Sequence, residues 1–220
     1  MTRIDNVGRV EALSGKATSA VIFLHGYGAD GDDLLGLAEP LAPHLPNTLF
    51  LSPDAPEECV TNPFGRQWFP IPWLDGSAPE DAAAGLARSS EDLSAFLDQV
   101  IAAEGLAPSQ IALVGFSQGT MMSLQVAPRR KQALAGVVGF SGRLLRADVL
   151  AAETVTKPPM LLLHGDVDQI VPFGDLKQAA DALSAAGFDV RTHVMRGTGH
   201  GISPDGLGQA LAFLKAHLPV

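Results

Sequence analysis

Short apolar runs alternate along this chain with longer segments of helical periodicity. The runs are rich in β-branched residues and apolar on both faces, as strands are when helices cover both sides of a sheet. Strands are predicted at residues 20–24, 48–51, 111–115, 135–140, 160–164 and 189–194. Because strands that cross over through helices pair in parallel, the alternation predicts an α/β fold, a mostly parallel sheet with helices on both faces.

The clearest helix is predicted to begin after Ser77, where Ser77 and Glu80 fit a capping box and Pro79 lies in the first turn. Gly105 is expected to end it. Further helices are predicted at about residues 32–42, 118–127, 174–186 and 204–218. No composition break, linker or internal repeat divides the chain, and its length suits one well-filled core, so residues 1–220 are predicted to form a single domain.

Residues 53–75 fit neither period. This stretch is rich in proline and carries Trp68, Phe69 and Trp73. Long loops in compact domains usually have a function. Two interpretations stay open, an apolar cluster that seals a sheet edge and a wall that faces a substrate.

The charge balance argues against several classes of partner. The chain has 24 Asp and Glu residues against 15 Lys and Arg, a formal net charge of −9, and we expect no nucleic-acid partner. The apolar runs are far shorter than the roughly 18 residues of a membrane span, and the N-terminus lacks a signal-peptide core, so a cytoplasmic protein is expected. Cys59, the single cysteine, is expected to be a free thiol.

The strongest functional signal is Gly115-Phe116-Ser117-Gln118-Gly119. A strand-like run precedes it and a helix-like run follows it, which is the context that a G-x-S-x-G nucleophile elbow requires. On so tight a turn the serine backbone is strained, and the flanking glycines remove side chains that would collide with their neighbours. We therefore expect the Ser117 hydroxyl to stand above the sheet, near the positive N-terminal end of the next helix.

A serine hydroxyl is a weak nucleophile near neutral pH and needs a histidine base and a carboxylate that orients it. Asp166 and Asp168 follow one late predicted strand, and His200 lies in the glycine-rich loop after the next. Because the carboxyl ends of parallel strands meet at one edge of a sheet, these residues are expected near Ser117. Spacing does not separate the two aspartates, since either could orient the base or cap the turn.

Other candidates fit the chemistry less well. His164 and His193 fall inside predicted strands and are expected to fill the core or its margin. Ser141 imitates the elbow, but Arg143 stands where the second glycine should be and no helix begins at once. Ser117 and His200 are therefore preferred.

An oxyanion needs a second donor besides the backbone N–H of Gln118. His25-Gly26-Tyr27-Gly28 follows the first predicted strand and can expose such an amide at the same edge. The alternative is a simple glycine turn that enters a helix, and both interpretations stay open.

These motifs occur in order along the chain, and together they resemble the phospholipase/carboxylesterase family of α/β hydrolases, which includes acyl-protein thioesterases and small bacterial carboxylesterases. The resemblance runs from about residue 20 to 218. The segments that carry it are Phe23-Leu24-His25-Gly26-Tyr27-Gly28, residues 115–119, 164–172 and 199–200, and Arg66-Gln67-Trp68-Phe69, which is similar to the family's R-x-W-F segment. Thr120 and Gly201 depart from the family's usual residues next to the motifs.

The resemblance implies an α/β-hydrolase fold and a serine carboxylesterase that works through an acyl-enzyme, without metal or organic cofactor. It implies Ser117 as nucleophile, Asp168 as orienting acid and His200 as base. The amides of Tyr27 and Gln118 would form the oxyanion hole.

No cap domain is expected between the strands near residues 140 and 160, so the nucleophile should be fairly open and short or single-chain acyl substrates are expected. The partner would be a small-molecule ester, with an acylated protein or a lysophospholipid as further options. An acyltransferase and a non-catalytic binding protein remain alternatives on the same fold. The apolar residues expected to line an acyl groove are Trp68, Phe69, Leu144 and Leu145.

Overall fold

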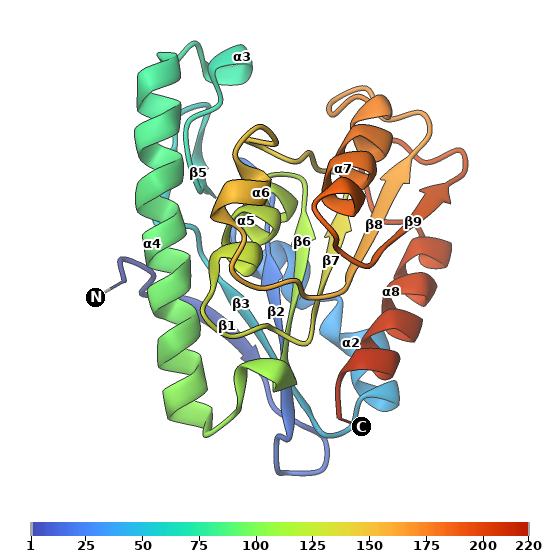
Figure 1. Ribbon diagram of the computed structural model, residues 1–220. Helices are drawn as coiled ribbons and strands as arrows, with labels where there is room; N and C mark the ends of the chain where they lie inside the picture. Colours follow the sequence, from blue (N-terminus) through green and yellow to red (C-terminus); the bar gives the residue numbers. More distant parts are fainter. Residues whose placement is uncertain (1, 220) are drawn as a thin grey trace.

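A twisted sheet runs through the centre of the molecule (Figure 1). The computed structural model describes residues 2–219, and within them the sheet has seven strands in the order β1-β3-β2-β6-β7-β8-β9. The antiparallel edge strand β1 pairs with β3, and every other neighbouring pair is parallel. The strands are β1 (Val7–Val10), β2 (Ser19–Leu24), β3 (Thr48–Pro53), β6 (Ile111–Phe116), β7 (Gly136–Phe140), β8 (Met160–Gly165) and β9 (Val190–Met195).

Helices cover both faces of this sheet, which confirms the predicted α/β architecture. One face packs against α4 (Pro79–Glu104), α5 (Gln118–Val126) and α7 (Gly174–Ala185). The other face packs against α1 (Gly31–Leu35), α2 (Ala38–Leu41) and α8 (Pro204–His217). Short elements lie between them: α3 (Pro72–Asp75), α6 (Leu150–Glu153), and the 3₁₀ turns η1 (Ala42–His44), η2 (Pro108–Gln110) and η3 (Ala127–Arg129).

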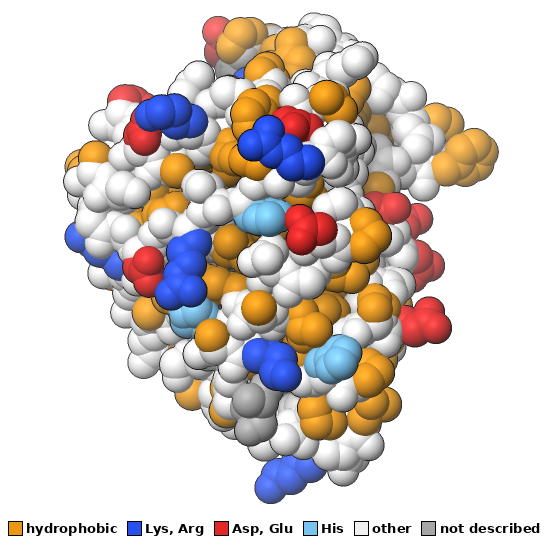
Figure 2. Space-filling model, turned by 90° about the vertical axis from the view of Figure 1, so that its right-hand side faces the viewer, with side chains coloured by type: hydrophobic (Ala, Val, Ile, Leu, Met, Phe, Trp, Pro, Cys, Tyr) orange, Lys and Arg blue, Asp and Glu red, His pale blue; other side chains and the backbone are white. Residues whose placement is uncertain are grey.

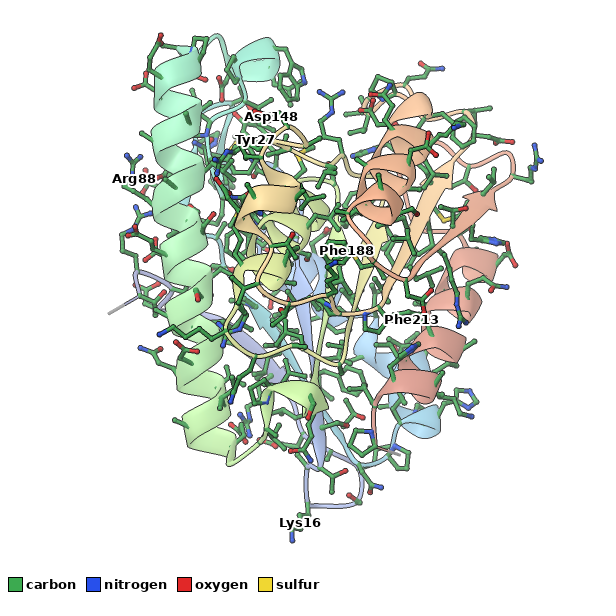
Figure 3. All side chains as sticks on the ribbon, viewed as in Figure 1. Lys16, Tyr27, Arg88, Asp148, Phe188 and Phe213 are labelled. Atoms are coloured by element: carbon green, nitrogen blue, oxygen red, sulfur yellow. The ribbon has the colours of Figure 1, made fainter. Side chains whose placement is uncertain are left out.

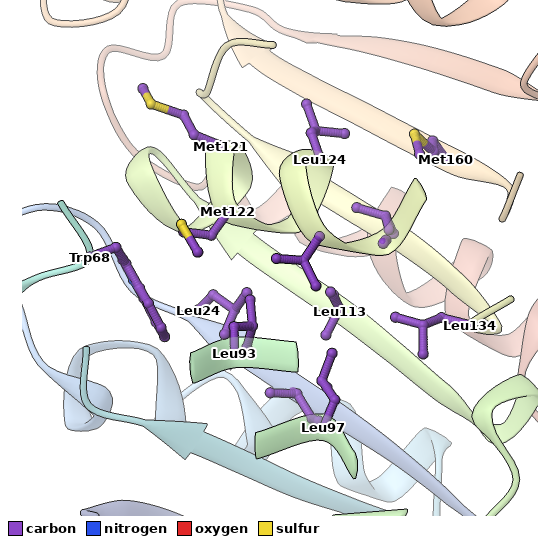
Figure 4. Close-up of a cluster of buried hydrophobic side chains, with 14 of the residues drawn as sticks. Leu24, Trp68, Leu93, Leu97, Leu113, Met121, Met122, Leu124, Leu134 and Met160 are labelled. Carbon is purple, nitrogen blue, oxygen red and sulfur yellow. The ribbon is translucent and has the colours of Figure 1, made fainter. Parts of the chain in front are cut away.

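The core divides into two clusters because the central strands bury side chains on both faces. Leu24 and Leu113 face the α4 and α5 side, where they belong to one cluster with Leu93 and Met122 (Figure 4). Phe23 stacks on Phe50 on the opposite face, with ring centroids 5.9 Å apart. Burial on both faces explains why these strands are apolar runs without alternation.

The structure corrects several boundaries. The N-cap of α4 is Ala78, without a side-chain cap, so the predicted Ser77–Glu80 capping box is wrong. The Ser77 N–H instead donates to Asp75 Oδ1 at 2.9 Å, which holds the chain out of the helix. Gly105 ends α4 in the left-handed conformation, as predicted. The helix predicted at 32–42 is two short helices, α1 and α2, interrupted around Gly36.

Part of the proline-rich stretch is ordered as a hairpin that lies apart from the main sheet. It consists of β4 (Glu57–Cys59) and β5 (Asn62–Gln67), paired antiparallel. Sequence periodicity predicts neither the hairpin nor β1.

The carboxyl ends of the parallel strands meet at the top of Figure 3, where Tyr27 lies, far from Lys16 at the bottom. The chain between β7 and β8 holds only the short helix α6, so no cap domain is inserted there. On the face that carries α8 and β9, acidic and basic side chains are interspersed (Figure 2). None of the helices in the described part of the chain combines the length and the apolarity needed to cross a membrane.

Candidate active site

Ser117 stands on a sharp turn between β6 and α5. Its backbone has φ 53° and ψ −113°, a left-handed conformation that costs a non-glycine residue about 1–3 kcal/mol. The Ser117 N–H donates to the Phe140 carbonyl of the neighbouring strand at 2.8 Å, which holds the strained turn in place. A Cβ atom at Gly119 would lie 1.8 Å from the Leu24 carbonyl, so only glycine lets α5 come this close to β2.

His200 lies beside Ser117 in the loop between β9 and α8. Its Nε2 atom is 3.0 Å from Ser117 Oγ, and its Nδ1 atom is 2.8 Å from Asp168 Oδ2. The imidazole also packs on the Phe116 ring, with centroids 4.8 Å apart. The structure therefore brings the hydroxyl, imidazole and carboxylate into one hydrogen-bonded chain, although the residues are far apart in sequence.

Asp168 is held by its own turn as well as by His200. The backbone N–H groups of Ile170 and Val171 donate to Oδ1 at 2.8 Å and 3.0 Å, and the side chain is 0% exposed. Burial acts to raise the pKa of Asp168, but the bonds from His200, Ile170 and Val171 outweigh it, and the pKa lies below the ordinary value. The group is therefore a carboxylate at neutral pH and can stabilise an imidazolium.

Asp166, the competing aspartate, lies elsewhere. Its Oδ1 accepts the Gly197 N–H at 2.7 Å, so it braces the loop that leads to His200 without contacting the ring. Ser141 shares the left-handed backbone of Ser117, with φ 47°, but it is fully buried, and His200 is hydrogen-bonded to Ser117.

The turn after β2 faces Ser117 with a peptide whose direction is fixed by His25. A Cβ atom at Gly26 would lie 3.4 Å from the Ser117 Cβ, so this loop lies against the elbow. The Ala55 N–H donates to His25 Nε2 at 2.9 Å, which leaves the ring proton on Nδ1, where it is donated to the Gly26 carbonyl at 2.8 Å. In a trans peptide the N–H points opposite to the carbonyl, so this bond sets the direction of the Tyr27 N–H.

His25 is fully buried, and this burial lowers its pKa below the ordinary value. The ring is thus neutral at physiological pH, as the bond from the Ala55 N–H requires. The histidine–glycine turn is visible in the sequence, but nothing there reveals that the side chain turns back on its own loop.

Gln118, the first residue of α5, ties the elbow to the loop at residues 68–69. The Trp68 N–H donates to Gln118 Oε1 at 2.9 Å, and Gln118 Nε2 donates to the Phe69 carbonyl at 2.7 Å. Trp68 Nε1 in turn donates to the His25 carbonyl at 3.1 Å. Two buried side chains, those of Gln118 and Trp68, therefore connect the elbow, the turn after β2 and the loop.

Trp68 does not line a groove, contrary to the prediction. Its side chain is 0% exposed and packs in the core cluster with Leu24 and Leu93 (Figure 4), where its ring N–H donates to the His25 carbonyl. Ser117 is likewise less open than expected, at 8% exposed, although no cap domain covers it. The Phe116 ring, His200 and the Gly26 turn flank it instead.

The hairpin β4–β5 clamps the turn after β2. The Gly28 N–H donates to the Arg66 carbonyl at 2.9 Å, the Arg66 N–H donates to the Ala29 carbonyl at 2.7 Å, and Asn62 Nδ2 donates to the Gly28 carbonyl at 2.8 Å. A Cβ atom at Gly65 would lie 2.1 Å from the Gly28 carbonyl, so the approach needs glycine. Sequence analysis missed Asn62, since an asparagine in a turn carries no distinguishing signal.

Two pockets lie near the site and hold the other predicted lining residues. An apolar pocket of about 260 Å³ is lined by Phe69, Trp73, Leu86 and Leu145, among others. A more polar neighbour of about 390 Å³ shares Leu145 and Arg146 with it and adds Leu144 and Arg143. A third pocket, of about 320 Å³, adjoins His200 and Phe116. Within residues 2–219, no group of three or more His, Cys, Asp or Glu side chains is arranged to hold a metal ion.

The comparisons with known proteins identify the family of this chain. The sequence profile described as Phospholipase/Carboxylesterase matches residues 6–218. The chain is 30% identical to acyl-protein thioesterase 1 of Gibberella zeae, over 96% of this chain and 97% of that protein, and 31% identical to acyl-protein thioesterase 1 of Saccharomyces cerevisiae, with the same coverage. The crystal structure of esterase PE8 superposes with a TM-score of 0.91 at 42% identity, over 96% of this chain and 98% of that one. The chain therefore belongs to the phospholipase/carboxylesterase family of α/β hydrolases and is an ester hydrolase.

Proposed function

We propose that this protein is a serine carboxylesterase in which Ser117 is the nucleophile, His200 the general base and Asp168 the residue that orients His200. The observation that carries the proposal is the unbroken chain of contacts from Ser117 Oγ through the imidazole to a buried carboxylate, at 3.0 Å and 2.8 Å. The left-handed backbone of Ser117 supports it, because strain of this kind is retained where a turn must present a reacting group.

In the first step, His200 Nε2 accepts the Ser117 proton while Oγ forms a bond to the carbonyl carbon of the ester. The backbone N–H groups of Tyr27 and Gln118 donate to the oxygen that becomes negative. When the tetrahedral intermediate collapses, the bond to the leaving alcohol breaks and His200 gives it the proton. Water then attacks the acyl-enzyme through the same base, the acid leaves and Ser117 recovers its proton.

The acyl chain is proposed to lie against Phe69, Leu144 and Leu145. Support comes from the apolar pocket that Phe69 and Leu145 share and from the bond between Gln118 and the Phe69 carbonyl, which joins that wall to the elbow. A pocket of about 260 Å³ suits a short or medium single chain.

The test is labelling by a serine-directed fluorophosphonate together with hydrolysis of an activated butyrate ester. The wild type is expected to take up one label per chain and to hydrolyse the ester, and Ser117→Ala is expected to do neither. Ser141→Ala is the matched control, since Ser141 has a similar backbone conformation, and it should still react. Labelling that persists in Ser117→Ala would place the nucleophile elsewhere.

A thioester of an acylated protein is the second candidate substrate. It is favoured by the two relatives named acyl-protein thioesterase 1, each matched over 96% of this chain. Matched oxyester and thioester substrates of the same chain length, including an S-acylated peptide and a lysophospholipid, would rank these classes by kcat/KM. Product analysis with a competing alcohol separates hydrolysis from acyl transfer.

A further inference from the structure

A second histidine contacts Asp168. His164 lies on β8, and its side chain is 1% exposed. Its Nε2 atom is 3.0 Å from the Val171 carbonyl oxygen and 3.3 Å from Asp168 Oδ2. The ring meets Phe173 edge-on, with centroids 6.1 Å apart. The hydrogen bond between His164 and Val171 therefore joins the two ends of the turn that carries Asp168.

The position of one proton on His164 follows from its partners. A carbonyl oxygen can only accept a hydrogen bond, so the contact with Val171 requires the proton on Nε2. The Nε2 atom that carries this proton also lies 3.3 Å from Asp168 Oδ2, although its N–H bond is directed at the Val171 carbonyl. An interaction of this kind is strong where water is excluded, and both side chains are buried.

The two oxygens of Asp168 are thus surrounded by donors. Oδ1 accepts from Ile170 and Val171, while Oδ2 faces an imidazole on each side, Nδ1 of His200 at 2.8 Å and Nε2 of His164 at 3.3 Å. The charged and titratable groups that these contacts place against His164 are Asp168 and, across it, His200. The mechanism proposed above uses His200 and gives His164 no role.

We propose that His164 is a positioning residue for the Asp168–His200 pair. It holds the turn through its hydrogen bond to the Val171 carbonyl, and the partial positive charge of its Nε2–H group, 3.3 Å from Asp168 Oδ2 at the nitrogen, keeps the carboxylate a weak base. The proton taken from Ser117 then stays on His200, where the leaving group can receive it. This inference rests on the proposed roles of Ser117, Asp168 and His200.

Two variants separate this role from packing. His164→Phe keeps a ring against Phe173 but removes the N–H group, and His164→Gln places an amide N–H near the position of Nε2. In His164→Phe we expect kcat to fall roughly three- to tenfold, the rate equivalent of one ordinary hydrogen bond, with KM within about twofold of wild type. Loss of the His164 N–H dipole beside Asp168 also favours the imidazolium form of His200. The acid limb of the kcat/KM profile should therefore move to higher pH.

His164→Gln is expected to recover most of the rate and the wild-type acid limb. His217→Phe is the matched control, because His217 also contacts a backbone carbonyl, that of Phe213, but lies at the end of α8, and it should leave kcat and the pH profile unchanged. Fluorophosphonate titration corrects all rates for the active fraction.

A folded His164→Phe variant with wild-type kcat and acid limb would overturn the inference. So would a rate loss without a shift of the acid limb that His164→Gln does not repair, since a packing defect behaves in this way. Either result leaves the proposed function standing, because that fails only if Ser117→Ala keeps its activity or its label.

Discussion

Gln118 and Trp68 are joined beneath the candidate active site, where the Trp68 backbone N–H donates to Gln118 Oε1 at 2.9 Å. The other end of the same amide donates to the Phe69 carbonyl at 2.7 Å. Both backbone groups belong to an irregular loop that has no strand or helix to satisfy them, so a single side chain from α5 does so. The residue whose backbone N–H is proposed to stabilise the oxyanion thus also fixes the loop that carries Phe69.

Replacement of Gln118 by leucine should therefore destabilise the protein. It leaves the Trp68 N–H and the Phe69 carbonyl buried without partners, and we expect the free energy of unfolding to fall by at least about 2 kcal/mol in urea denaturation. Gln125→Leu is the control, because Gln125 is also buried on α5 but its Oε1 has no hydrogen-bond partner among residues 2–219. If the free energy of unfolding fell equally in both variants, the hydrogen bonds of Gln118 to Trp68 and Phe69 would add nothing to stability.

His25 offers a test of the proposed oxyanion hole. His25→Phe removes the bond to the Gly26 carbonyl and frees the peptide that carries the Tyr27 N–H, so kcat is expected to fall about 100-fold with little change in KM. The affinity for a trifluoromethyl ketone, which mimics the tetrahedral intermediate, should fall in parallel. His25→Asn, which keeps a donor near Nδ1, should recover part of both, whereas a lower kcat with unchanged inhibitor affinity would contradict this role.

The features that local patterns specify are the ones that the sequence predicts well. The strand before Ser117 and the glycines around it form a local signal, because the strained turn needs specific residues at adjacent positions. The contact of His200 with Ser117 follows from the topology, since parallel strands bring their carboxyl ends to one edge.

The orientation of a side chain and the pairing of segments that are distant in sequence are harder to predict. The composition of residues 53–75 shows that they are apolar, but whether Trp68 faces inward depends on the His25 carbonyl, a partner distant in sequence. The hairpin β4–β5 pairs with the turn after β2 through backbone groups, and backbone bonds leave no trace in residue types. The capping box at Ser77 failed because Asp75 competes for its N–H.

The buried His25 should also make the stability of the fold depend on pH. Burial lowers its folded pKa, and this outweighs the opposing effects of the Gly26 carbonyl and of Asp54, Asp30 and Asp33. Because the folded pKa is below the unfolded value of about 6.5, the unfolded state binds more protons in this range. The stability that neutral His25 contributes is therefore complete above about pH 6.5 and is lost as the pH falls towards the folded pKa.

Urea denaturation of the wild type and of His25→Phe between pH 7.5 and 5 checks this dependence. The difference in unfolding free energy between the two proteins should shrink as the pH is lowered. A difference that stays constant over this range would mean that His25 titrates alike in the folded and unfolded states.

Substitutions of Leu145 and Trp68 should have different effects, the first on the choice of acyl-chain length and the second on the stability of the core. Leu145→Ala enlarges the pocket of about 260 Å³, so the ratio of kcat/KM for an octanoyl ester to that for a butyryl ester should rise severalfold. Trp68→Phe removes the bond to the His25 carbonyl from a fully buried side chain, so it should lower the unfolding free energy by about 1–3 kcal/mol and leave the chain-length profile unchanged. A chain-length profile that changes in Trp68→Phe but not in Leu145→Ala would place the acyl chain elsewhere, because only a group that touches the substrate can distinguish its length.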